Sequence, residues 1–181
     1  KPPEKPRLVA VPGDRKVTLY WDSRAELSWD PFLQEYDFEG YKIYKSTDPN
    51  FLEAFIITDA HGNKLFKKPI AQFDLINDVE GFSKTTVEGV AYFLGNNTGL
   101  THSWTDTTVK NGQRYFYAVC AYDRGADSIE IYPSENSISV SQTLRGGFVL
   151  PKNVVMVTPN PQTLGYVSSE IFQLEHISGK G

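Results

Sequence analysis

The side chains in this sequence most suited to chemistry are acidic groups gathered in two loop regions. They are Asp22, Glu26, Asp30 and Asp37 in the first region, and Asp123, Asp127, Glu130 and Glu135 in the second. Calcium prefers carboxylate and carbonyl oxygens supplied by loops. Neither group has the D-x-D-x-D-G spacing of an EF-hand loop, so two interpretations stay open: a structural calcium ion that rigidifies a loop, or solvated acids without an ion.

Residues for catalysis are sparse. The histidines His61, His102 and His176 lie far apart, and the sequence has no HExxH, GxSxG, P-loop or GxGxxG motif. A single cysteine, Cys120, excludes an internal disulfide and reads as a strand residue of modest reactivity. We therefore expect a protein that is not an enzyme, with no catalytic residue and no cofactor apart from the possible calcium ion.

Aromatic side chains raise the possibility of sugar binding, because planar rings stack on pyranose faces. Trp29 is the best candidate, since it lies in the polar loop 28–31, where a core role is less obvious. Tyr44, Phe116 and Tyr122 face away from the first core by strand parity, but the inserted segment could cover them. Packing inside the protein remains the alternative for all four rings.

Composition indicates a folded, acidic protein. Its 181 residues exceed a typical single domain, and its 40% hydrophobic and 13% aromatic content predicts a packed core. A net charge of -4 argues against nucleic-acid binding, and no apolar run is long enough to predict membrane insertion. The chain begins at Lys1 without Met or a leader, so we expect a signal peptide or upstream modules to have been removed.

Alternating apolar residues predict antiparallel strands. The residues expected on inward faces are Val17, Leu19 and Trp21; Tyr41 and Ile43; Tyr115, Tyr117, Val119 and Ala121; and, in the last strand at 137–140, Ile138 and Val140. The lysines beside Tyr41 and Ile43 can reach solvent, and Trp104 lies on another short strand. Since no segment shows a sustained helical stripe, we predict an all-β antiparallel sandwich.

Several of these residues resemble the fibronectin type III family. That family has a core tryptophan on its second strand, a Tyr-x-Ile/Val pattern on its third, and a leucine-like residue six positions before a corner tyrosine. Here these are Trp21, Tyr41 with Ile43, and Val109 with Tyr115. The resemblance implies that the corner tyrosine hydroxyl bonds the preceding backbone and fixes the turn.

Longer runs extend the resemblance. SWTDTTVKNGQRYFYAVCAYD is similar to the late strands of the family, and PSENSISVSQT to its last strand. GYKIYKSTDPNF and NGQRYFYAVCAYDRG also resemble a variant from long, multi-domain surface proteins of Bacteroidetes-like bacteria. The similarity covers 6–48 and 102–144, about half of the chain.

The domain organisation departs from the family at two places. We expect a linker at 1–7 and a domain at 8–144 with a β-rich insertion at about 51–101, which turns at 59–63 and 77–81 and folds against the sandwich. Residues 145–181 are predicted to begin with a hinge. The rest of this segment is predicted to be either the truncated start of a following module or a docked tail. The apolar stretch 148–157 should pair with a sheet, in its own domain or in a neighbouring copy.

Together these features predict a non-catalytic interaction or spacer module of a bacterial secreted or cell-surface protein. The expected partners are neighbouring domains of the same chain, other surface proteins or glycans. Two alternatives stay open: a carbohydrate-binding accessory module of a secreted hydrolase that uses Trp29, and an assembly subunit that donates its C-terminal strand to another sheet.

Overall fold

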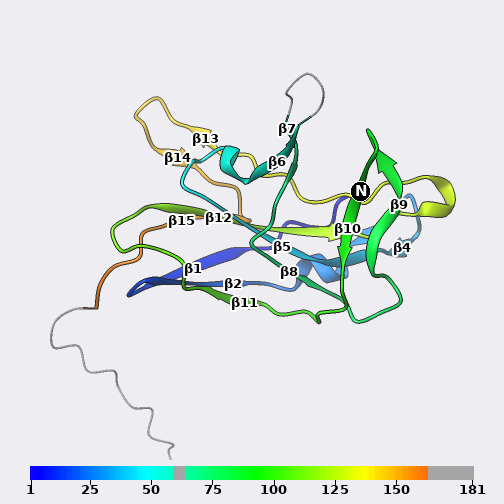
Figure 1. Cartoon of the computed structure of the whole chain (residues 1–181), viewed down its shortest axis with the longest axis horizontal. Helices are drawn as coiled ribbons and strands as arrows, with labels where there is room; N and C mark the ends of the chain where they lie inside the picture. The colour runs from blue at the N-terminus through cyan, green and yellow to red at the C-terminus, as the bar shows by residue number, and fades with distance from the viewer. Residues whose placement is uncertain (59–63, 163–181) are drawn as a thin grey trace, which may run out of the picture.

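Two antiparallel sheets form the body of the protein. The computed structural model describes residues 1–58 and 64–162 (Figure 1). One sheet has the strand order β1 (Leu8–Gly13), β2 (Lys16–Trp21), β11 (Ser103–Asp106). The other has the order β15 (Val154–Val157), β12 (Tyr115–Asp123), β5 (Phe38–Ser46), β8 (Ala71–Asp74). The prediction of an all-β, sandwich-like fold is confirmed.

The main core lies between these sheets and contains the residues predicted from alternation, apart from Ile138 and Val140. Val17, Leu19 and Trp21 of β2 are buried, as are Tyr41 and Ile43 of β5. The inward-facing residues of β12 are also buried, namely Tyr115, Tyr117, Val119 and Ala121. Because side chains alternate between the faces of a strand, one face of each strand reaches this core.

The turn before β12 is held by Tyr115. The backbone N–H of Lys110 donates a hydrogen bond to the Tyr115 hydroxyl at 3.0 Å. Val109 is buried in the main core beside it, and Trp104 packs against the same core while partly exposed. The hydroxyl therefore has the backbone contact that was expected of a corner tyrosine.

A second layer covers the outer face of the four-stranded sheet. It consists of three hairpins: β6 (Phe55–Thr58) with β7 (Lys64–Lys67), β9 (Gly81–Val87) with β10 (Val90–Gly95), and β13 (Ser141–Gln142) with β14 (Phe148–Val149). Figure 1 shows these hairpins on the side opposite β1, β2 and β11. Tyr44, Phe116 and Tyr122 are buried beneath this layer. The insertion supplies only part of the cover: its Tyr92 packs against Tyr122, whereas Phe116 packs against Phe148, which lies outside the insertion.

The insertion folds against the sandwich as expected, but one of its turns lies elsewhere. The predicted reversal at 59–63 lies outside the described residues, although β6 and β7 on either side pair. The predicted reversal at 77–81 is wrong, because this segment connects β8 to β9 and is anchored by the Asn77 amide, which donates to the Glu39 carboxylate at 3.1 Å. The second hairpin reverses at Glu88 and Gly89, with φ of 51° and 77°.

The predicted last strand at 137–140 is wrong. Ile138 and Val140 pack partly buried in the second layer, and β15 takes the place beside β12. The reason lies in Asn136, whose side-chain oxygen accepts the Ala121 N–H of β12 at 3.0 Å and ends pairing there. The stretch 148–157 therefore pairs within its own chain.

The two segments that were expected to be a hinge and a linker are both held by hydrogen bonds. Residues 145–147, expected as a hinge, lie in the turn between β13 and β14, where Thr143 N–H bonds the Gly147 carbonyl at 2.8 Å. The expected linker 1–7 contains no strand before Leu8, but its Pro3 carbonyl accepts the Asn136 amide at 2.6 Å. No helix within 1–58 and 64–162 has the length and apolarity needed to cross a membrane.

Candidate functional site

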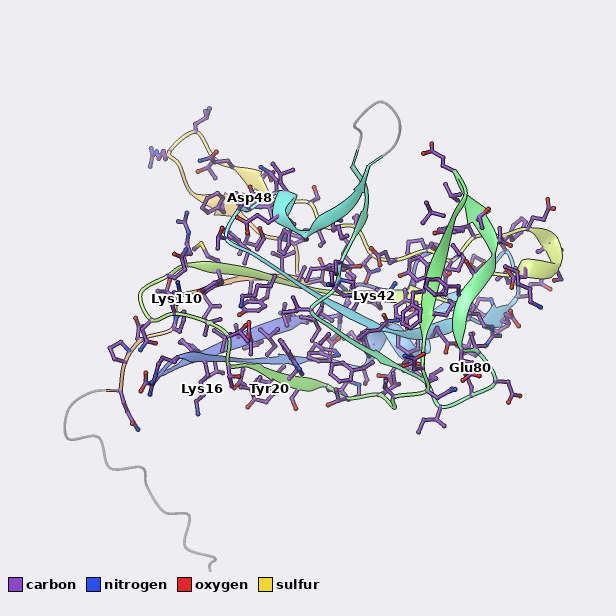
Figure 2. All side chains as sticks on the ribbon, in the orientation of Figure 1. Lys16, Tyr20, Lys42, Asp48, Glu80 and Lys110 are labelled. Carbon is purple, nitrogen blue, oxygen red and sulfur yellow. The ribbon has the colours of Figure 1, made fainter. Side chains whose placement is uncertain are left out.

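A pocket opens on the outer face of the four-stranded sheet, next to the β9–β10 hairpin. Its volume is about 380 Å³. Lys42 and Tyr44 of β5 lie in its lining because alternation turns them away from Tyr41 and Ile43. In Figure 2, Lys42 is labelled between the β6–β7 and β9–β10 hairpins. The pocket therefore forms where the insertion leaves part of the outer sheet face uncovered.

Lys42 places a buried ammonium group at this pocket. The side chain is only 5% exposed, although it was expected to reach solvent. Its Nζ lies 3.4 Å from the ring centre of Tyr92 and 5.0 Å from that of Tyr122. Burial lowers the pKa of Lys42 to about 8, against the opposing charge of Glu135. No hydrogen bond or ion pair joins Lys42 to the side chains that the structure describes.

Glu135 lies on another side of the pocket and is engaged by tyrosines. Its carboxylate accepts the Tyr44 hydroxyl at 2.9 Å and the Tyr92 hydroxyl at 2.7 Å. Burial raises the pKa of both tyrosines well above the usual value, so both remain donors at neutral pH. The Tyr132 hydroxyl is also buried, and within the described part of the chain it has no hydrogen-bond partner.

Comparisons with known proteins do not identify the chain. No family model, curated protein or solved structure matches it. The pocket combines a buried cation, a hydroxyl without a partner among the described residues, and aromatic faces. Groups of these kinds are the ones that can bind and orient a ligand.

A second candidate surface is the segment 27–36, which we call the exposed hairpin. It follows the turn η1 (Arg24–Leu27) and contains β3 (Trp29–Asp30) and β4 (Glu35–Tyr36). Four large apolar side chains in it face solvent, with exposed fractions of 77% for Leu27, 51% for Trp29, 75% for Phe32 and 59% for Tyr36. Trp29 and Tyr36 are opposite each other, with ring centres 5.0 Å apart. Trp29 thus lies outside the core, where a binding role requires it.

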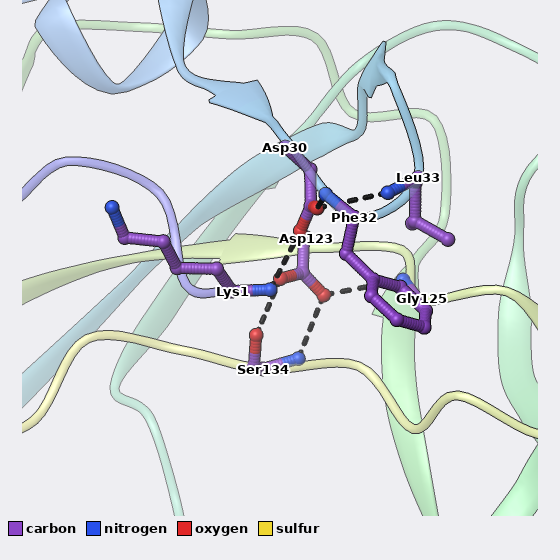
Figure 3. A network of polar contacts seen from close by, with 7 residues as sticks. All are labelled: Lys1, Asp30, Phe32, Leu33, Asp123, Gly125 and Ser134. Atoms are coloured by element: carbon purple, nitrogen blue, oxygen red, sulfur yellow. Dashed lines mark hydrogen bonds and ion pairs between the residues drawn. The ribbon is translucent and has the colours of Figure 1, made fainter.

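Asp30 fixes the shape of the exposed hairpin from inside. Its Oδ1 accepts the N–H groups of Phe32 at 2.7 Å and Leu33 at 3.0 Å (Figure 3). The apolar side chains are therefore displayed by a hairpin whose turn is held by several bonds.

The acidic residues considered for calcium are distributed among other partners. Asp30 and Asp123, one from each predicted group, are both buried. Burial, then the neighbouring charges of Asp123 and Asp30, raise the pKa of Asp37 to about 6. Other members bond elsewhere: Glu26 to Tyr41, Asp127 to Thr85, and Glu135 to Tyr44 and Tyr92.

The described acidic side chains do not come together into a set of ligands for a calcium ion. Within the described ranges, no group of three or more His, Cys, Asp or Glu side chains is placed to hold a metal ion. Asp22 pairs with Arg24 at 3.4 Å, and Glu130 is exposed near η3 (Asp127–Ile129). Calcium binding stays a prediction.

Sequence reasoning missed the pocket residues Lys42, Tyr92 and Tyr132. The alternation of side chains along β5 could have indicated the burial of Lys42. Lys42 lies on the same face of the strand as Tyr44, for which cover by the insertion was considered. Nothing in the sequence indicated that Tyr92, fifty positions away, would lie over Lys42.

Removing the Lys42 charge should stabilise the fold. The pKa of about 8 lies below the 10.5 of an unfolded lysine, so the unfolded chain binds more protons between these values and wild-type stability rises with pH there. Lys42→Met should raise the free energy of unfolding at neutral pH by about 1–3 kcal/mol and remove that rise. Urea unfolding from neutral to alkaline pH measures both effects.

Lys16→Met is the matched control, because Lys16 is an exposed lysine on β2. It should change neither the stability nor its pH dependence. If the two variants had the same free energy of unfolding and the same pH dependence, burial of the Lys42 charge would not cost folding free energy.

Proposed function

We propose that this chain is a non-catalytic interaction module of a secreted or surface-displayed bacterial multi-domain protein, built on a fibronectin type III-like framework. The three-stranded and four-stranded antiparallel sheets support this proposal, as does the Tyr115 contact with Lys110. Two of the sequence runs that resemble the family contain β5 and β12, the central pair of the larger sheet, whereas the run at 133–143 supplies no strand to that sheet. The framework is generic, so the function is assigned to what the framework displays.

The exposed hairpin is the observation that carries the proposal. Scattered apolar side chains are normal on a surface, but four large ones within ten residues form a patch that favours a partner. Tryptophan and tyrosine are enriched among the side chains that dominate protein interfaces. Leu27 and Phe32 add exposed aliphatic and aromatic area within the same hairpin. This mixture favours a protein surface, either a neighbouring domain of the natural polypeptide or another surface protein.

A carbohydrate is the second candidate, and the position of Trp29 is the specific observation that favours it. The ring is half exposed and is held edge-on by Tyr36 with an interplanar angle of 77°. A sugar could stack on such a fixed face. In this case, Trp29 would carry most of the binding, and Leu27 and Phe32 would matter little.

Hydrogen exchange of the natural polypeptide, compared with this chain alone, tests the proposal. We expect the amides of 27–36 to be more protected when neighbouring domains are present, and Phe32→Ser to abolish the difference. Ile76→Ser is the matched control, since Ile76 is 78% exposed outside the hairpin.

The alternative is tested by pull-down on polysaccharides. Binding that disappears in Trp29→Ala but persists in Phe32→Ser would replace the protein partner with a glycan. Unchanged exchange in 27–36, together with no polysaccharide binding, would overturn the assignment of this hairpin as an interaction surface.

A further inference from the structure

The pocket on the outer sheet face contains a charge that the fold does not need. Burying an ammonium group without an ion pair costs free energy, and an apolar residue of similar length would pack there without this cost. Lys42 is 5% exposed and contacts ring faces rather than a carboxylate. A retained cation of this kind is suited to pairing with an anion that enters the pocket.

Two lysines and one carboxylate supply the charge on which the binding of an anion depends. They are Lys42, Lys68 and Glu135. Glu135 does not form an ion pair with Lys42, and it already accepts hydroxyl bonds from Tyr44 and Tyr92. A ligand that carries negative charge would therefore balance the site.

An unused donor belongs to a tyrosine that packs against the same aromatic ring as this cation. The Tyr132 ring packs edge-on against Tyr92 with centres 5.9 Å apart, and Lys42 Nζ lies over the same Tyr92 ring. The Tyr132 hydroxyl is buried and bonds to none of the described residues. Since a buried hydroxyl normally has a partner, an acceptor atom of a ligand is the group that would satisfy it.

The remaining walls favour a flat, mainly apolar body. Phe82 and Phe93 also line the pocket, with ring centres 5.1 Å apart, and Phe82 is 66% exposed. A volume of about 380 Å³ is at the small end of the range for ligand sites. A single ring with a short substituent suits these dimensions.

We propose that this pocket binds a small carboxylate carried on a six-membered ring. The carboxylate pairs with Lys42 and accepts a hydrogen bond from Tyr132, while the ring lies against Tyr92, Phe82 and Phe93. Either an aromatic acid or a hexuronic acid has this chemistry. The inference is independent of the exposed hairpin, because the two sites share no residue.

Calorimetric titration of the whole chain at about pH 6.5, where Lys42 is charged, tests the proposal. The probes are 4-hydroxycinnamate and glucuronate, with 4-hydroxycinnamamide and glucose as their neutral counterparts. We expect at least one acid to bind at least about 10-fold more tightly than its neutral counterpart, as pairing with a desolvated charge requires. Which acid binds distinguishes the aromatic source from the sugar source.

Two substitutions locate the binding. Lys42→Met should weaken acid binding by about 10-fold or more, and Tyr132→Phe by about 3- to 10-fold, whereas Lys16→Met should leave it unchanged. Tyr132→Phe removes only an oxygen that has no partner in the described chain, so a purely structural tyrosine would show no loss.

Direct observation of Lys42 keeps the test decisive if a variant folds poorly. Selective ¹³C labelling of lysine Cε should show a shift of the Lys42 signal on addition of the acid. The proposal is overturned if neither acid saturates the wild-type protein below about 10 mM. It is also overturned if acid and neutral probe bind equally, or if Lys42→Met binds as wild type does.

Discussion

A chain that ends at Leu144 is expected to lose the cooperative unfolding transition that a chain ending at Gln162 retains. The shorter chain lacks β15, which pairs with β12 and buries Val154 and Val157. Each buried valine is worth about 1.5–3 kcal/mol, so the two together contribute a large share of a normal folding free energy. Urea titration followed by circular dichroism measures the loss.

A point variant separates the role of β15 from general effects of truncation. Val154→Ser should lower the unfolding midpoint clearly, because Val154 is 4% exposed. Met156→Ser on the same strand is the matched control, since Met156 is 44% exposed. An unchanged midpoint in the chain ending at Leu144, with β12 amides still protected from exchange, would show that β15 is peripheral.

The second large effect is expected for Asp106→Ala, which should cost about 3–5 kcal/mol of folding free energy. The Asp106 carboxylate is buried and bonds Lys45 Nζ at 2.8 Å, the Tyr117 hydroxyl at 2.6 Å and the Thr108 N–H at 2.8 Å. The substitution leaves the largely buried Lys45 ammonium and the buried Tyr117 hydroxyl without this acceptor. Chemical denaturation at neutral pH measures the cost.

The same carboxylate predicts an acid sensitivity. Burial acts to raise the pKa of Asp106, but hydrogen bonds from Lys45, Thr108 and Tyr117 outweigh it and lower the pKa. The stabilisation is therefore present above the usual pKa of 3.8 and is lost as the pH falls through the lower folded value. Asp106→Ala should lack this part of the acid dependence.

An exposed ion pair is the matched control for Asp106. Glu4 and Lys152 are 2.7 Å apart, but their side chains are 50% and 38% exposed. Glu4→Ala should cost only about 0–1 kcal/mol because solvent screens such pairs. If Asp106→Ala cost no more than this control, the buried network would not be a main contributor to stability.

The core strands could be predicted from the sequence because alternation is a local property. Val17, Leu19 and Trp21 alternate within six residues, and only one face of their strand could be apolar. The identity of the last strand was not local in this way. Residues 137–140 and 154–157 are both short segments with several apolar side chains, and the choice between them follows from the Asn136 side chain, which bonds Ala121 of β12.

The two candidate sites differ in how far the sequence could predict them. Trp29 stands among polar and turn-forming residues, so its position outside the core followed from its neighbours. The pocket depends on contacts between distant segments, since Lys42 meets Tyr92 of the insertion and Glu135 lies beyond β12. Strand parity indicates which way Lys42 points, but only the packed insertion determines what it meets.

The meeting of the first and last described segments has a consequence for how the protein is made. Leu8 N–H bonds the Lys152 carbonyl at 2.9 Å, and Pro3 is held by Asn136. During translation, the edge of β12 that pairs with β15 has no partner until residues 154–157 have left the ribosome. The larger sheet is therefore completed only after nearly all the described chain has been synthesised. Closing such long loops is slow, so the chain should be sensitive to aggregation through the open edge of β12 until 154–157 has paired.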